Sequence, residues 1–552
     1  MNEFAKTGAA LAAAVAVTAL AVSMKPGEVR LDLFDDQGEV FFPAFTDGDA
    51  INELEVTAFR ESSSDKYAFA VKRDDDAVWR IPSHGNYPAD ANDQMGKAAS
   101  MLIGLKKDAV VGDAKGRHAE YGLVDPFAEG VETEGRGKRI KLKDKAGNVL
   151  ADLIVGDEVE GKAGTFYCRL PGKKRIYKTK LQGSLSTQFA DWIETDLLKA
   201  QSWNVNKIVF DNYSVDEQKG QIVKGDRLVL EKGDDNKFAF VGLDAATEET
   251  NVEKATEIGN TLGEIKIVGV RPKPEGLTAR LERANGFEAQ VLRQQLQQKG
   301  FFLAGGKLVS NEGDLIFETK SGVRYTLRFG ELVYGEGDEV TSGIGSDNGQ
   351  EGDDKSTANN RYLMVTAEFV EALLDKPEGA RLEQAELDKR RQARTTVEAI
   401  VKAIDGYKAA NEGALPADLA ALAVKPAEGE ALLQEVKPDP WGNAFQFTQE
   451  GEAFSVTSLG ADGKPGGDGA AKDVSSAALA DEDAIDEAAS AWTAYDGQVK
   501  TGQEEAGQLT KRFGPWYYVI DKALFDKLKP QRADLVKAKE ADAAAAGPEG
   551  GK

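Results

Sequence analysis

The sequence predicts an α+β protein with an N-terminal membrane helix, two duplicated strand-rich units, and a smaller α+β domain carried on a helical stalk inside the second unit. Three observations predict this fold class. Residues 7–24 carry no charge, a hairpin pattern occurs at both 140–159 and 315–333, and the composition changes character over 395–475. At ~150 residues per domain, a chain of this length holds three or four domains.

The composition excludes several classes of function. The 552 residues include 69 Lys and Arg against 93 Asp and Glu, so the formal net charge is −24. We therefore expect no nucleic-acid partner, because nonspecific phosphate binding depends on Lys and Arg. One cysteine allows no internal disulfide, and two histidines allow no multi-histidine metal site. We interpret those histidines, His84 and His118, as turn residues rather than catalytic bases.

The N-terminal uncharged run, Thr7 to Met24, is flanked by Lys6 and Lys25. Eighteen uncharged residues are a candidate membrane helix, and a cleaved secretory signal is the alternative. The lysine before the run and the acidic chain after it favour a cytoplasmic N-terminus. We thus expect an inner-membrane protein with one span and a periplasmic bulk, or a periplasmic protein released by signal cleavage.

A duplication organises the middle of the chain. Residues 140–159 and 315–333 each hold an alternating strand, a Lys-x-Gly turn and a second strand. Glycine permits the positive φ that a tight hairpin turn requires. In each copy, strands and a helix-like stretch precede this hairpin. The last two strands are adjacent in copy one, at TFYCRL and RIYKTK. In copy two they are RYLMVT at 361–366 and WYYVID at 516–521, so a long insertion separates them.

Insertions are best tolerated at loop tips, where few buried contacts cross them. We therefore expect the insertion to leave from a hairpin tip of the second unit, and its charged flanks to form two antiparallel helices. The predicted parts are an anchor or signal at 1–25, unit one at 45–203, unit two at 204–366 completed by 513–537, the insertion at 376–512 with its core at 395–475, and a disordered tail at 538–552.

The two units resemble an exported bacterial family catalogued as domain of unknown function 4340. The residues that carry the resemblance are WRIPSHGNYPAD at 79–90, Tyr121-Gly122-Leu123, STQFADWIETDLL at 186–198 and WYYVID at 516–521. Genes of this family often lie beside components of ABC-type transporters and gliding machinery, so the resemblance implies partners of that kind. It implies no chemistry.

The inserted domain contains a helix with an apolar stripe, Leu415-Pro416, the motif Asp439-Pro440-Trp441-Gly442-Asn443, and a Gly-rich acidic loop from Leu459 to Asp473. In this order, the motifs resemble the globular domain of the major pseudopilin of type II secretion. That family begins with a hydrophobic helix that packs its filament. Here the preceding residues, EQAELDKRRQAR, are highly charged, so we do not expect this copy to polymerise as a pilus subunit.

The acidic loop is a candidate calcium site. Calcium binds six to eight oxygen ligands, and Asp462, Asp468 and Asp473 supply carboxylates among five glycines. The loop is no EF-hand, because Lys464 stands where an oxygen ligand is required. From the loop alone, a solvated turn is the simpler interpretation. The pseudopilin resemblance favours calcium instead, and it implies a carbonyl ligand from Leu459 and side-chain ligands from Asp462 and Asp473.

These observations predict a non-enzymatic, membrane-anchored scaffold with a calcium-stabilised head, acting as an accessory component of envelope transport, type II secretion or gliding. Its expected partners are envelope proteins, including secretion or ABC-transporter components. Two alternatives stay open. One is an envelope hydrolase with carboxylates in a cleft between the units, and the other is a ligand-binding protein of an ABC transporter. The sequence does not indicate the oligomeric state.

Overall fold

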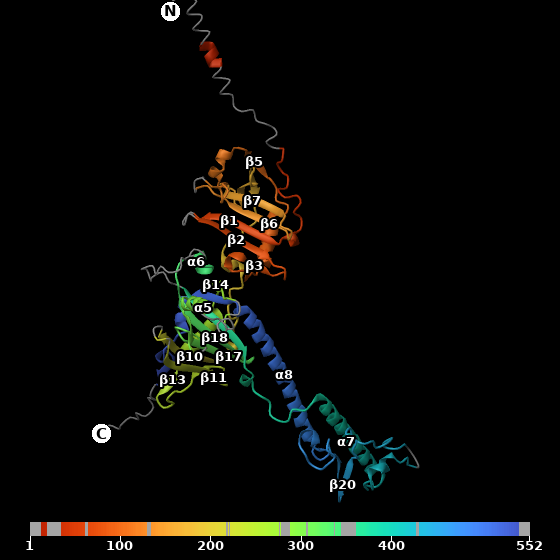
Figure 1. Ribbon diagram of the computed structural model, residues 1–552. Helices are drawn as coiled ribbons and strands as arrows, with labels where there is room; N and C mark the ends of the chain where they lie inside the picture. The colour runs from red at the N-terminus through yellow and green to blue at the C-terminus, as the bar shows by residue number, and fades with distance from the viewer. Residues whose placement is uncertain are drawn as a thin grey trace, which may run out of the picture.

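The computed structural model describes residues 13–18, 35–60, 65–129, 134–216, 219, 221–274, 277, 287–304, 307–335, 337–343, 360–426 and 430–539. Most of the predicted membrane helix and almost all of the predicted tail lie outside these residues. Within them, no helix has the length and apolar character needed to cross a bilayer. The fold is a mixture of helices and strands, as predicted (Figure 1).

The first unit is an antiparallel sheet with the strand order β4-β3-β2-β1-β6-β7-β8-β9-β5. Helix α2 (Asn92–Leu102) covers it with a buried face that includes Met95 and Met101. The strands are β1 Glu53–Arg60, β2 Asp65–Arg73, β3 Trp79–Ile81, β4 Tyr87–Pro88, β5 Ala109–Gly112, β6 Lys138–Lys143, β7 Val149–Glu158, β8 Thr165–Arg169 and β9 Ile176–Lys180.

The second unit has a sheet with the order β12-β11-β10-β17-β18-β19-β23-β14. Helix α3 (Val252–Glu264) buries Ile258 and Leu262 in the hydrophobic core of the protein. The strands are β10 Val205–Asp216, β11 Gln221–Lys232, β12 Phe238–Phe240, β14 Gly269–Pro272, β17 Asp314–Thr319, β18 Val323–Val333, β19 Asn360–Phe369 and β23 Trp516–Asp521. Smaller elements are β13 Glu248–Thr250, α5 Phe287–Gln297, β15 Phe301–Ala304, β16 Lys307–Ser310, α6 Asp338–Thr341, α9 Lys522–Lys527, α10 Arg532–Leu535 and β24 Val536–Ala538.

The two sheets match strand by strand. The order β3-β2-β1-β6-β7-β8-β9-β5 in the first corresponds to β12-β11-β10-β17-β18-β19-β23-β14 in the second. Strands β8 and β9 form a hairpin, whereas their counterparts β19 and β23 pair across a long excursion of the chain. That excursion contains α7 (Gln384–Ala410) and α8 (Leu479–Phe513). The C-terminal end of α8 packs on the second sheet, with Ala506 and Phe513 in the core, and from there the helix extends outward to α7 (Figure 1). The residue boundaries drawn between domains remain a prediction.

One hydrophobic core runs through both units. It includes Leu54 and Phe69 from the first sheet, and Phe210 and Leu327 from the second. In β17, alternate residues are buried, so Leu315 lies in this core while its neighbours in sequence face the other side of the sheet.

The stretch LSTQFADWIETDLL at 185–198 has a helix-like sequence, and the prediction of a helix there is wrong. Only Phe189–Trp192 form a helical turn, of 3₁₀ type. Apolar side chains on all sides of the segment are buried, including Trp192 and Leu197. The segment therefore packs between the two units. The Leu197 amide donates to the Ile265 carbonyl of unit two at 3.0 Å. A surface helix would instead keep one polar face.

His84 lies in the contact between the units. Its Nε2 hydrogen-bonds Thr341 of unit two at 3.0 Å, and its ring stacks on Phe189 at 4.1 Å between centroids. Nearby, Tyr87 meets Trp516 edge-on at 4.9 Å. The prediction of a turn residue is correct for the local backbone, since Pro82–His84 form a 3₁₀ turn. It missed that the imidazole is buried.

This burial predicts a pH dependence of stability. Burial of the ring and, to a smaller extent, the positive charge of Arg271 lower the pKa of His84 from 6.5 to about 4. Between these values the unfolded chain binds a proton that the folded chain does not. The stabilisation is therefore complete above about pH 6.5 and is lost as the pH falls toward 4. The loss attributable to His84 should be about 3 kcal/mol.

Thermal unfolding of the wild-type chain and of His84→Gln, followed from neutral pH to about pH 4, measures this loss. We expect the wild type to lose more stability than His84→Gln over this range. His118→Gln is the comparison variant: burial also lowers the pKa of His118, but without the large shift of His84, so this variant should flatten the dependence less than His84→Gln does. Parallel curves for the wild type and His84→Gln would contradict the assignment.

Candidate functional site in the inserted domain

Helices α7 and α8 run antiparallel where they meet, and charged pairs join them. Arg391 contacts Asp486 at 2.9 Å, and Arg394 contacts Asp483 at 2.7 Å. These side chains are partly exposed, so each pair stabilises the contact by no more than about 1 kcal/mol. The charged stretch before Thr395 is thus paired with the acidic start of α8.

A buried ion pair lies between the same helices. The side chain of Arg390 is 2% exposed and that of Glu482 is 5% exposed. Arg390 Nε donates to Glu482 Oε2 at 3.0 Å, and Nη2 donates to Oε1. Its Nη1 donates to two backbone carbonyls, those of Gly469 (3.2 Å) and Lys472 (2.7 Å). One guanidinium therefore joins α7, α8 and the acidic loop.

The motif Asp439-Pro440-Trp441-Gly442-Asn443 is hydrogen-bonded to the start of this loop. The buried carboxylate of Asp439 accepts the amides of Trp441 (3.1 Å) and Asn443 (2.7 Å) and, at 2.6 Å, the hydroxyl of Ser458. The Asn443 amide group then donates to the Gly460 carbonyl at 3.0 Å. The motif thus orients the start of the loop.

The acidic loop connects β21 (Ala453–Ser458) to β22 (Val474–Ser475), which form a small sheet with β20 (Gln446–Glu450). All five of its glycines have positive φ. At Gly460 a Cβ atom would lie 2.7 Å from the Ala471 carbonyl oxygen, so only glycine fits this close approach. The two ends of the loop are therefore held together by backbone geometry.

The four predicted calcium ligands differ in their exposure to solvent and in their hydrogen bonds. Leu459 is buried at the start of the loop. Asp462 is exposed and accepts the Lys464 amide at 3.1 Å. Asp468 is also exposed. Asp473 is half-buried, and its Oδ2 accepts the Gly466 amide at 2.9 Å.

The two oxygens of Asp473 differ in their surroundings. Its Oδ1 is buried and has no hydrogen-bond partner among the described residues. An unpartnered buried carboxylate oxygen is costly unless a cation or water satisfies it. Within the described part of the chain, no three His, Cys, Asp or Glu side chains are gathered as a metal site. The loop thus suits a site with one fixed carboxylate and backbone carbonyls, rather than a cluster of three acids.

Lys472 does not occupy the loop. Its ammonium pairs with Asp481 of α8 at 2.8 Å, so this adjacent positive charge is directed toward the helix. The loop keeps its acidic character around Asp473 as a result.

Sequence reasoning missed the Arg390–Glu482 pair and the bracing role of Asp439. A signal for the pair was present, because Arg390 precedes the stripe residue Val397 by seven positions and so lies on the same helix face. A charged residue on a core-facing stripe requires a partner, which the stripe alone does not identify.

Comparisons with known proteins agree with two parts of this description. A family model of a domain of unknown function (DUF4340) matches residues 79–280. A model of type II secretion system protein G matches residues 380–477. The inserted domain is similar to protein G. The type II secretion system core protein G of Vibrio cholerae serotype O1 is 34% identical over 94 residues, which are 15% of this chain and 64% of that relative. The chain therefore spans less than two thirds of the curated relative's length.

Breaking the buried pair should destabilise the inserted domain strongly. Glu482→Gln leaves the Arg390 charge buried without a counterion, at a cost of about 3–5 kcal/mol. Asp486→Asn breaks the exposed pair with Arg391 one helical turn away, and should cost at most about 1 kcal/mol. Hydrogen exchange of the α7 backbone amides in the full chain measures both. Equal loss of protection in the two variants would refute a special role for the buried pair.

Proposed function

We propose that this chain is a non-enzymatic, membrane-anchored scaffold that presents a protein G-like head to components of an envelope secretion or transport system. The similarity of residues 380–477 to type II secretion system protein G suggests a secretion-related role. The observation that carries the proposal is the position of this head at the far end of α8 (Figure 1). With 35 residues and a rise of ~1.5 Å per residue, α8 spans roughly 50 Å.

The attachment of the head supports presentation rather than polymerisation. The first half of α7 is bound to α8 through one buried pair and two partly exposed ones. A pseudopilin-like filament would need that region as a free hydrophobic helix. The head is therefore available to partners through its other surfaces, and we propose envelope proteins of a type II secretion-like, ABC-transporter or gliding-associated system as those partners.

The location proposed for the chain is the inner membrane, with Thr7–Met24 as a single span, the N-terminus in the cytoplasm and both units in the periplasm. The uncharged run and its flanking lysines support this location. Signal cleavage, with release into the periplasm, is the alternative.

We also propose that the acidic loop binds calcium. Asp473 Oδ1, which is already buried and unpartnered, would be the fixed ligand, together with loop carbonyls that include that of Leu459. Asp462 and Asp468 are exposed and are not gathered around Asp473 in the described structure, so they would join the site only by closing over the ion. Calcium would supply charge neutralisation there. The chain's own part is to hold the loop ends together, through Gly460, Asn443 and the Arg390 guanidinium.

Calcium should raise the melting temperature of the head in the full chain. A ligand that binds only the folded state stabilises it by about 2.7 kcal/mol at a hundredfold excess over its Kd. Melting with calcium and with a chelator measures the effect. Asp473→Asn and Asp462→Asn should abolish it, while Glu452→Gln, on an exposed turn of the same domain, should retain it. An unchanged melting temperature in millimolar-range calcium, the range of weak extracellular sites, would refute the site.

Deleting the head should leave the two sheets folded while it impairs the proposed role in secretion. A Cβ atom on Gly379 would lie 3.4 Å from the Ala488 Cβ, so the two ends of the head meet there. A variant in which a short Gly/Ser linker joins Gly379 to Ala488 deletes residues 380–487 and retains the end of α8 that packs on the second sheet. We expect the sheets to melt almost as in the full chain.

In the producing bacterium, the same variant should reduce export of a type II secretion substrate, measured in the medium. Full-length protein expressed from the same plasmid is the control. Undiminished export with a correctly folded, headless chain would count against the proposed presentation of the head.

A further inference from the structure

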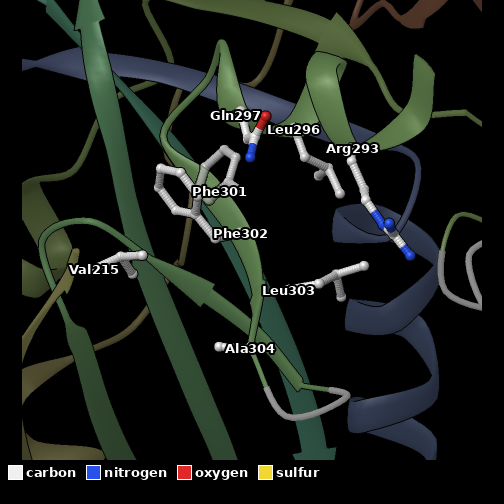
Figure 2. Close-up of a pocket in the computed structure, with 8 residues that line it drawn as sticks. All are labelled: Val215, Arg293, Leu296, Gln297, Phe301, Phe302, Leu303 and Ala304. Atoms are coloured by element: carbon white, nitrogen blue, oxygen red, sulfur yellow. The ribbon is translucent and has the colours of Figure 1, made fainter. Parts of the chain in front are cut away.

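A groove lies on the face of the second sheet that is turned away from the main core. Its volume is about 810 Å³, and it is bordered by β10, β11, β17, β18 and the hairpin β15–β16. A smaller cavity of about 70 Å³ lies under the same hairpin, between α5, β15 and Val215 of β10 (Figure 2). Helix α5 and the β15–β16 hairpin thus cover this face only in part and leave space above the strands.

Charged residues cross the floor of the groove in one row. In the strand register, Arg227 stands opposite Asp211, Asp211 opposite Asp314, and Asp314 opposite Arg328. Directly opposed residues share a face of the sheet. The row therefore lies on the face opposite to Phe210, Leu315 and Leu327, which are in the core.

A β-bulge adds Lys224 to this face. Residues three apart normally point to opposite faces of a strand. Here the register shifts, so Asn212 of β10 faces two residues, and both Lys224 and Arg227 line the groove. Gly225 makes the bulge possible, because a Cβ there would lie 1.9 Å from the Asn212 carbonyl oxygen.

The groove has an excess of positive charge in an acidic chain. Its described lining contains four cations, Lys224, Arg227, Lys307 and Arg328, against two carboxylates. Asp314 is already engaged, since it accepts the Tyr213 hydroxyl at 2.6 Å and lies 3.3 Å from Arg328 Nη2. Arg328 Nε is buried with no acceptor among the described residues.

The remaining cations of the lining are exposed at the rim. Lys224, Arg227 and Lys307 form no ion pair with any carboxylate that the structure describes. They are therefore available to a partner that carries negative charge.

The rim of the groove is also an open sheet edge. Strand β12 pairs with β11 only from Leu230 to Lys232. From Gln221 to Leu228, no strand among the described residues pairs with the outer side of β11. The exposed side chains of this edge include Ile222 and Val223, which are 42% and 52% exposed. An apolar open edge is a template for another strand.

We propose that an extended acidic segment of a partner protein pairs with the β11 edge at 221–228 and directs carboxylates to Lys224, Arg227 and Lys307. Backbone hydrogen bonds to the edge would supply affinity, and the cations would select acidic side chains. A long polyanion such as nucleic acid is disfavoured by the net charge of −24. This site requires neither the calcium loop nor the head.

The test uses the full-length chain and fluorescein-labelled octapeptides that alternate Glu with Val or Lys with Val. We expect saturable anisotropy binding of the acidic peptide, no binding of the basic peptide, and weaker binding as salt rises. Lys224→Gln and Arg227→Gln should each lower the affinity about three- to tenfold. Lys72→Gln, an exposed lysine on the equivalent strand β2, should leave it unchanged.

A second set of measurements separates strand pairing from simple charge attraction. An acidic peptide with alternate amides N-methylated cannot form the edge hydrogen bonds, and it should not bind. Equal binding of that peptide, or equal binding of the basic peptide, would overturn the proposal. So would sedimentation showing that the chain dimerises through this edge and excludes the peptide. Melting curves of the variants establish that any lost affinity does not come from unfolding.

Discussion

The pairing of β19 with β23 organises the second unit and everything inserted into it. The chain leaves the second sheet after Phe369 and must return at Trp516 beside the strand that it left. Whatever lies between has to begin and end at neighbouring points. Two antiparallel helices meet this requirement, because one leads outward and the other leads back. The head can therefore be large without disturbing the sheet.

The Arg390–Glu482 pair extends the same constraint into the head. A buried ion pair contributes little net stability compared with apolar packing, yet its two directional hydrogen bonds restrict the relative position of its partners. Here the guanidinium also binds two carbonyls of the acidic loop. The orientation of α7, the course of α8 and the shape of the loop are thus set together. This coupling connects the proposed calcium site to the stalk.

Several features could be predicted from the sequence because they depend on neighbouring residues. Alternation in β17 and β18 indicates strands, and the repeated Lys-x-Gly turns indicate the duplication. The motifs of the inserted domain are equally local, and the similarity to protein G agrees with them. The failure at 185–198 has a local cause too. A segment buried on every side has no polar face, so its periodicity does not distinguish a helix from an extended chain.

The order of residues along the chain therefore specifies the set of elements, their duplication and the kind of domain inserted between them. Tertiary structure alone decided that the two units share one core, that Arg390 finds Glu482, and that Lys224 and Arg227 face the same groove. The physical reason is the range of the interactions. Strand alternation and glycine turns act over a few residues, whereas a shared core, a buried ion pair and a bulge that reorients a strand arise only from segments far apart in the chain.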